Sequence, residues 1–117
     1  NKIDYFFKEA KLKIDNLLKD VKFHTFGHLG DSNIHYNLIE PNNLEDDFYS
    51  YEKNLKKIIN DLIKEISGSI SAEHGIGLLK RDDFIETKSE LEIELMKNIK
   101  KIFDPKNILN ENKIFKN

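Results

Sequence analysis

The sequence of 117 residues contains no cysteine and only two prolines. The absence of cysteine excludes disulfides, thiolate nucleophiles, iron-sulfur clusters and cysteine-type zinc sites, and it is compatible with a reducing compartment. Any metal ligand must therefore be a histidine, a carboxylate or an amide. The predicted location is cytoplasmic.

Net charge and long apolar runs are lacking as well. Lysine and arginine number 19 against 21 aspartate and glutamate residues, which leaves no global field to attract nucleic acid or an anionic membrane. Charges interrupt the apolar pattern of residues 1–15, and no later apolar run approaches the length of a membrane span. We therefore expect a soluble chain that binds no nucleic acid.

Periodic apolar patterning is present, in a chain long enough for one hydrophobic core. Ile3, Phe7, Ala10, Ile14 and Leu17 recur at steps of three and four residues, which predicts an opening amphipathic helix. Two stretches of alternating polarity follow, VKFHTFGH and NIHYNLIE. Their period of two is typical of half-buried strands, and the LGDS between them predicts a turn.

Two further helices and one further strand are predicted in the rest of the chain. Asn42 and Glu45 resemble a helix-start box before an apolar pattern that runs to Ile66, about six turns at 3.6 residues each. Residues 67–74 have the pattern of a short strand that leads into a Gly-Ile-Gly bend.

The last helix is predicted to begin at a capping box of Ser89 and Glu92 and to end before Pro105, with an irregular tail after it. The side chains expected on its buried face are Leu95, Met96, Ile99, Ile102 and Phe103. The order helix, strand, strand, helix, strand, helix predicts a single α+β layer sandwich.

His28 and His35 flank the predicted turn, and a hairpin can bring two such imidazoles to one point in space. The alternation places His35 and Asn37 together on the face opposite the apolar residues. Two ordinary surface or turn histidines would give the same pattern, because a histidine pair without a third ligand is a weak motif. His24 has the strand parity of His28, although a structural or exposed role is the simpler reading.

Glu73 and His74 stand at the predicted strand end just before two glycines, where side chains commonly project into a site. Two histidines and one carboxylate leave coordination positions open, as in catalytic zinc and non-haem iron sites, and they also suit manganese. A solvated turn with a helix-capping role is the alternative reading of Glu73 and His74.

Three segments together resemble one family. FGHLGDSNIHYN, ISAEHGIGLLK and FDPKNILNENKIF are similar, in this order, to the C-terminal region of the FAD-linked oxidases. That family includes D-lactate dehydrogenase, D-2-hydroxyglutarate dehydrogenase and the D subunit of glycolate oxidase. The resemblance covers essentially the whole chain and implies oxidation of a D-2-hydroxy acid to a 2-keto acid, with hydride transfer to FAD.

The resemblance also implies roles for individual residues. His28, His35 and Glu73 match ligands of a divalent metal, zinc or manganese, and His74 matches the general base that takes the proton of the 2-hydroxyl. Asn37 matches an amide that contacts the substrate.

Four supporting positions follow from the same resemblance. Gly75 and Gly77 would let the backbone pass close to the flavin ring. Asn33 would brace the turn near the ligands, and Lys80 matches a position that is commonly basic.

The resemblance implies that residues 1–72 are part of a substrate cap and residues 73–117 a flavin-facing, helical segment. The cap would be a partial ferredoxin-like fold, an antiparallel sheet with helices packed on one face. Because the flavin-binding domain is absent, the chain alone is predicted to be inactive and to need that domain in trans or in its parent gene. An open sheet edge could drive self-association.

The sequence departs from the family in two places. Ser32 stands where the family usually has glycine, so a positive φ there would cost on the order of 1 kcal/mol or more. The family's tail pattern NPGKIF appears here as NENKIF, without its proline and glycine, which predicts weaker docking of the tail.

Two other functions remain open from the residues themselves. One is a free-standing metal-binding module or small metallohydrolase that uses His28, His35 and Glu73 with a bound water. The other is an inert remnant of a truncated gene.

Overall fold

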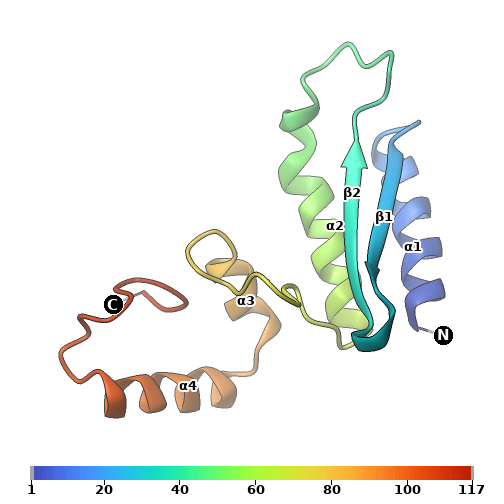
Figure 1. The fold of residues 1–117 in the computed structure, drawn as a ribbon. Coiled ribbons are helices and arrows are strands. Elements are labelled where there is room, and N and C mark those ends of the chain that lie inside the picture. The colour runs from blue at the N-terminus through green and yellow to red at the C-terminus, as the bar shows by residue number, and fades with distance from the viewer. Residues whose placement is uncertain (1, 117) are drawn as a thin grey trace. The chain divides into compact units, whose positions relative to one another are not determined.

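The computed structural model describes residues 2–116, which form two compact units that divide between Ala72 and Glu73. The first unit contains α1 (Lys2–Leu17), β1 (Lys22–His28), β2 (Asn33–Ile39) and α2 (Glu52–Glu65), with short 3-10 turns η1 (Leu29–Asp31) and η2 (Phe48–Tyr51) (Figure 1). The second contains α3 (Arg81–Thr87) and α4 (Glu90–Phe103). The predicted α+β class is confirmed.

The sheet of the first unit is the predicted hairpin. β1 and β2 pair antiparallel, from Lys22 opposite Ile39 to His28 opposite Asn33. Residues directly opposite one another share a face, so one face carries Phe23, Tyr36 and Leu38, and these side chains pack against α1 and α2. Both helices therefore cover the same face of the sheet.

The core of the first unit lies between these two helices and the hairpin. One cluster contains Ile14, Leu18, Val21 and Leu55, and the other contains Phe6, Ala10 and Leu62. Tyr36 packs against both clusters and meets the Phe6 ring edge-on at 5.3 Å between centroids. Its burial raises the pKa of Tyr36 to about 12.

The second unit is organised by helix caps. Ser89 and Glu92 form the predicted capping box, which begins α4. Asp104 follows α4 directly and accepts hydrogen bonds from the backbone N–H groups of Ile108 and Leu109, each at 3.0 Å. Its other partner is the Lys100 ammonium, at 2.7 Å. The chain therefore folds back as soon as the helix ends.

The tail docks inside this unit despite the missing proline and glycine. The N–H of Ile114 donates to the carbonyl of Gly77 at 3.0 Å, and Arg81 donates to the carbonyl of Asn112 at 3.1 Å. Asn112, within the NENKIF segment, adopts a φ of 59°. Asparagine visits this left-handed region more readily than most residues, so it suits this turn without a glycine.

One predicted boundary and one predicted element were wrong. The helix expected from Asn42 begins only at Glu52, because Asp47 instead caps the 3-10 turn η2 by accepting from the N–H of Tyr49. The strand expected at residues 67–74 is irregular: Ser69 and Ser71 bond to one another locally, which competes with extended pairing.

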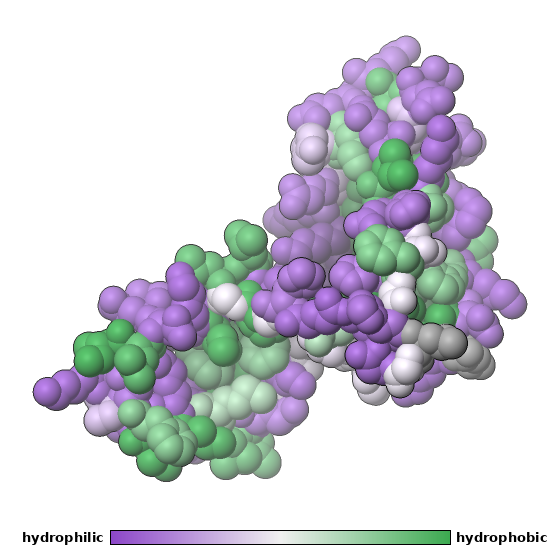
Figure 2. Space-filling model, in the orientation of Figure 1, coloured by the Kyte–Doolittle hydropathy of each residue, from purple (hydrophilic) through white to green (hydrophobic). Residues whose placement is uncertain are grey.

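Two further features differ from expectation in the second unit. A short helix, α3, forms where none was predicted. The face of α4 that was expected to be buried is exposed, with Leu95 at 53%, Ile99 at 56% and Phe103 at 80%. Figure 2 shows extensive apolar surface over this part of the chain. The 45 residues of this unit are too few to bury it on their own.

None of the helices between residues 2 and 116 combines the length and the apolar character that a membrane span requires.

Candidate metal and substrate site

The face of the hairpin that points away from the helices carries the polar residues singled out in the sequence. The register places His24 opposite Asn37, Phe26 opposite His35, and His28 opposite Asn33, so all six share this face. The predicted placement of His35 and Asn37, opposite the apolar side of the strand, is correct.

His28 and His35 lie close together although seven positions separate them in the chain. Their ring centroids are 6.3 Å apart, and one ring nitrogen of each lies within 4.8 Å of the other's. Zinc binds imidazole nitrogen at about 2.0–2.1 Å, so the two rings are near enough to share one ion after small rotations. His28 is exposed and His35 half-buried, which leaves the pair accessible to a ligand.

The backbone around this pair is tightly constrained. A Cβ added at Gly27 would lie 2.0 Å from the carbonyl oxygen of Asn33, so only glycine allows β1 to approach β2 this closely. Asn33 itself is buried, with 7% of its surface exposed. Ser32 closes the turn in the left-handed region, with a φ of 56°. The cost that was expected for a side chain at a positive φ therefore applies to Ser32.

Asn37 lies two residues beyond His35 on the same face. Its side-chain Nδ2 donates to the backbone carbonyl of His24 at 3.3 Å, and its side chain remains exposed. The hydrogen bond orients the amide, while its oxygen can still accept from a ligand.

Phe26 also lies on this face, and no motif in the sequence indicates a role for it. Its ring stacks on that of His35, with centroids 4.6 Å apart and planes 9° from parallel. It also meets His24 at 5.8 Å in a tilted arrangement. The available signal was strand parity, because Phe26 shares the parity of His24 and His28, but parity does not reveal which residue lies across the hairpin.

Glu73 and His74 belong to an irregular segment at the start of the second unit, and both are exposed. Gly75 and Gly77 follow with φ values of 74° and 56°, and neither has a heavy atom within 4 Å of an added Cβ. Backbone conformation rather than lack of space therefore requires glycine here. Lys80 is half-buried at the start of α3.

The third expected ligand, Glu73, belongs to the second unit, whereas the two histidines belong to the first. Glu73 directly follows Ala72, the last residue of that unit, so one peptide bond tethers it there.

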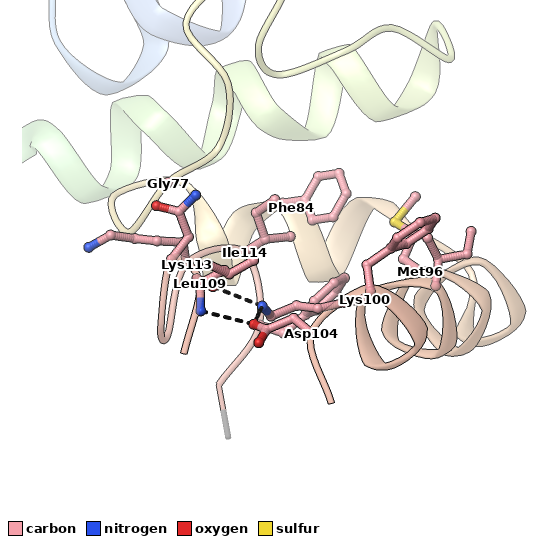
Figure 3. Close-up of a pocket in the computed structure, with 12 residues that line it drawn as sticks. Gly77, Phe84, Met96, Lys100, Asp104, Leu109, Lys113 and Ile114 are labelled. Atoms are coloured by element: carbon pink, nitrogen blue, oxygen red, sulfur yellow. Dashed lines mark hydrogen bonds and ion pairs between the residues drawn. The ribbon is translucent and has the colours of Figure 1, made fainter. Parts of the chain in front are cut away.

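A pocket of about 700 Å³ lies within the second unit, between α4 and the tail (Figure 3). Phe84, Met96, Ile99, Phe103 and Ile114 contribute apolar walls. Two of its charged residues, Lys100 and Asp104, are engaged with one another at 2.7 Å. The pocket offers apolar surface rather than a set of convergent catalytic groups.

Comparison with known proteins identifies the class of protein to which this chain belongs. The family model for the C-terminal domain of FAD-linked oxidases matches residues 2–114. The chain therefore belongs to this family.

Curated relatives of the chain include dehydrogenases and a transhydrogenase. The chain is 38% identical over 115 residues to D-2-hydroxyglutarate dehydrogenase of Stutzerimonas stutzeri, covering 97% of this chain and 25% of the relative. It is 40% identical over 90 residues to D-lactate dehydrogenase of Archaeoglobus fulgidus, covering 77% and 19%. A D-2-hydroxyglutarate–pyruvate transhydrogenase of Saccharomyces cerevisiae is 41% identical over 90 residues, covering 77% and 17%. The chain thus spans a quarter or less of the length of these relatives.

Proposed function

We propose that this chain is the C-terminal part of an FAD-dependent dehydrogenase that oxidises a D-2-hydroxy acid to the 2-keto acid. The observation that carries the proposal is the exposed face on which His28, His35 and Asn37 lie together, in a chain of the FAD-linked oxidase family. The names of the relatives support the substrate class.

His28, His35 and Glu73 would hold a divalent ion. Two imidazoles and a carboxylate are donors that zinc and manganese accept, and three protein ligands leave positions for the substrate. Such an ion would supply Lewis acidity, which lowers the pKa of a bound hydroxyl.

His74 would act as the general base. An imidazole has an ordinary pKa near neutrality, so it can accept the proton that leaves the 2-hydroxyl as the carbonyl forms. Asn37 would orient the substrate through its amide, which is already restrained by its bond to the carbonyl of His24. FAD, when bound, would supply the acceptor for the hydride that leaves the substrate Cα.

FAD would lie against the backbone at Gly75 and Gly77, where the space around both Cα atoms is open. Asn33 would support the turn that carries His28 and His35, and Lys80 would supply a positive charge beside the glycine bend. Most contacts to FAD would come from a flavin-binding part that these residues do not include. Residues 1–117 by themselves would therefore be inactive without a flavin-binding part, and the proposed location of the enzyme is the cytoplasm.

The primary test is the metal content of the purified chain by mass spectrometry after loading with zinc or manganese. Close to one ion per chain is expected, with loss of the ion in His28→Ala and in Glu73→Ala. His24→Ala is the matched control, because His24 is an exposed histidine of the same face outside the donor set. Equal metal content in all four proteins would contradict the proposed ligands.

A second test addresses the redox reaction. The chain is mixed with the flavin-binding part of the Stutzerimonas stutzeri relative, and bleaching of FAD absorbance by a D-2-hydroxy acid is followed. His74→Gln should abolish the bleaching while metal content stays unchanged. Bleaching at the native rate in His74→Gln would exclude His74 as the base.

A small metallohydrolase is the second candidate function. The exposure of His28 and Glu73 favours it, because open coordination positions could hold a water. Ester or peptide hydrolysis by the metal-loaded chain without FAD would support this alternative over the dehydrogenase.

Self-association is proposed as a property of the isolated chain. The sheet within residues 2–116 has two strands, and the sequence of β2 contains neither lysine nor proline, the residues that commonly protect an edge. Sedimentation velocity across a range of concentrations tests this, and a monomer at every concentration would contradict it.

A further inference from the structure

Phe26 is an apolar residue on an otherwise polar face. The other aromatic residues of the hairpin, Phe23 and Tyr36, pack against the core, whereas Phe26 is 55% exposed. Its neighbours on this face are three histidines and two asparagines. Burial in a core therefore does not explain its position.

The contact between Phe26 and His35 has a defined geometry. The two residues are directly opposite in the register, and their rings are nearly parallel, 9° apart at 4.6 Å between centroids. Two separate strands thus supply the two rings of the stack. The His24 ring meets Phe26 at 5.8 Å and 57°, so the parallel contact is specific to His35.

We propose that Phe26 is a positioning residue that holds the imidazole plane of His35 ready for the metal ion. The inference rests on the proposed function, in which His35 is a ligand, and adds a residue to it. The torsion between Cβ and the ring of a histidine has broad minima, so the backbone alone does not fix the ring plane. A flat aromatic surface against one side of the imidazole restricts that torsion.

The restriction matters because metal ligands must point their nitrogen at the ion within narrow limits. An imidazole that already has this orientation loses less rotational freedom when the ion binds. Metal-ligating histidines are usually oriented by a hydrogen bond to the second ring nitrogen, and removing such an outer contact typically costs 10–100-fold in affinity. At His35 the Phe26 ring contributes orientation through its face.

The test compares the zinc dissociation constant of the native chain with three variants of Phe26, measured by competition with a chelating dye. Phe26→Leu keeps an apolar side chain but removes the flat ring, and we expect about 10-fold weaker binding. Phe26→Ala should weaken binding at least as much. Phe26→Tyr keeps the ring and should bind within about twofold of the native chain.

Tyr49→Ala provides the matched control, because Tyr49 is an aromatic residue of the same unit that is 77% exposed and lies outside β1 and β2. It should leave zinc affinity unchanged. Circular dichroism of each variant without metal shows whether the first unit remains folded, so that loss of affinity is not confused with unfolding.

A spectroscopic readout separates orientation from general stability. Cobalt(II) in place of zinc gives visible absorption bands that depend on ligand geometry, and these should shift in Phe26→Leu but not in Phe26→Tyr. In the metal-free native chain, the ring protons of His35 should show an upfield NMR shift from the stacked ring, which Phe26→Leu removes.

The outcomes are distinguishable. Native zinc affinity and native cobalt bands in folded Phe26→Leu would overturn the positioning role and leave the proposed metal site intact. Affinity lost equally in Phe26→Leu and Phe26→Tyr would also overturn it, because the flat ring would not be the cause. A native chain that binds no metal would overturn the metal site, and the positioning role with it.

Discussion

The two units of this chain differ in the burial of their apolar residues. The first unit contains all the buried hydrophobic side chains found within residues 2–116, including the fully enclosed Ile14 and Leu62. In the second unit, Leu95, Ile102 and Phe103 of α4 are more than half exposed. The first unit can therefore be stabilised by its own core, whereas the second depends mainly on caps and local hydrogen bonds.

The difference bears on the proposed site. His28, His35 and Asn37 are positioned by a hairpin that rests on a core, while Glu73 and His74 come from an irregular segment at the start of the poorly buried second unit. Groups on rigid elements are better preoriented than groups on loops. The histidine pair is therefore the preformed part of the proposed metal site.

The largest effect is expected from a cavity in the first unit. Leu62→Ala should reduce the free energy of unfolding of the first unit by about 2–5 kcal/mol, the usual cost of truncating a buried leucine. Ile102→Ala in the second unit, at 75% exposure, should change stability by less than about 0.5 kcal/mol. Urea denaturation followed by circular dichroism measures the stability of both variants. A similar loss of stability in the two would contradict the difference in burial between the units.

Gly27→Ala should produce the next largest effect. The added methyl would lie 2.0 Å from the carbonyl oxygen of Asn33, so the strands must separate, at a cost of about 1–3 kcal/mol. Zinc affinity should fall as well, because the hairpin positions His28 and His35. Urea denaturation and a zinc titration test the two expectations, and a variant as stable as the native chain would contradict the close strand approach.

In the second unit, Ser89→Ala should cost about 1 kcal/mol, because the serine oxygen accepts from the N–H of Glu92 and begins α4. Ser89→Asp is the control, since aspartate caps helices equally well. Hydrogen exchange of the first turn of α4 should accelerate in the alanine variant only. Unchanged exchange would mean that the cap is not what holds this helix end.

Ser32→Gly should stabilise the first unit slightly. A side chain at a φ of 56° costs roughly 1–2 kcal/mol, against 0.5–1 kcal/mol lost through the greater freedom of glycine in the unfolded chain, so a net gain of about 0.5 kcal/mol is expected. Ser50→Gly, at an exposed position outside the hairpin, should give no such gain. The midpoint of urea unfolding provides the measurement.

The smallest effect should be visible only in acid. The Lys100 ammonium, together with the N–H groups of Ile108 and Leu109, lowers the pKa of Asp104. A carboxyl whose folded pKa is lowered stabilises the structure above its unfolded pKa, near 3.9, and loses that contribution as pH falls through the folded value. Protection of the Ile108 and Leu109 amides should therefore fall below about pH 4. The same acid response in Asp104→Asn would assign it to another group.

Much of the first unit could be predicted from pattern alone. Steps of three and four residues identified α1, and a period of two identified both strands and their polar face. Local chemistry sufficed for the start of α4 as well, because the capping box involves residues only three positions apart. The late start of α2 was missed, because the 3-10 turn η2, which Asp47 caps, comes directly before this helix.

The sequence by itself determined the family, the α+β class and the face that carries His28, His35 and Asn37, because motif order and side-chain alternation are properties of the chain. Only the tertiary structure decided that Phe26 stacks on His35, that residues 67–74 form no strand, and that the apolar face of α4 stays exposed. The physical reason is common to all three. Each depends on which partner lies across space, and a periodic pattern shows that a residue needs or offers a contact without showing what will provide it.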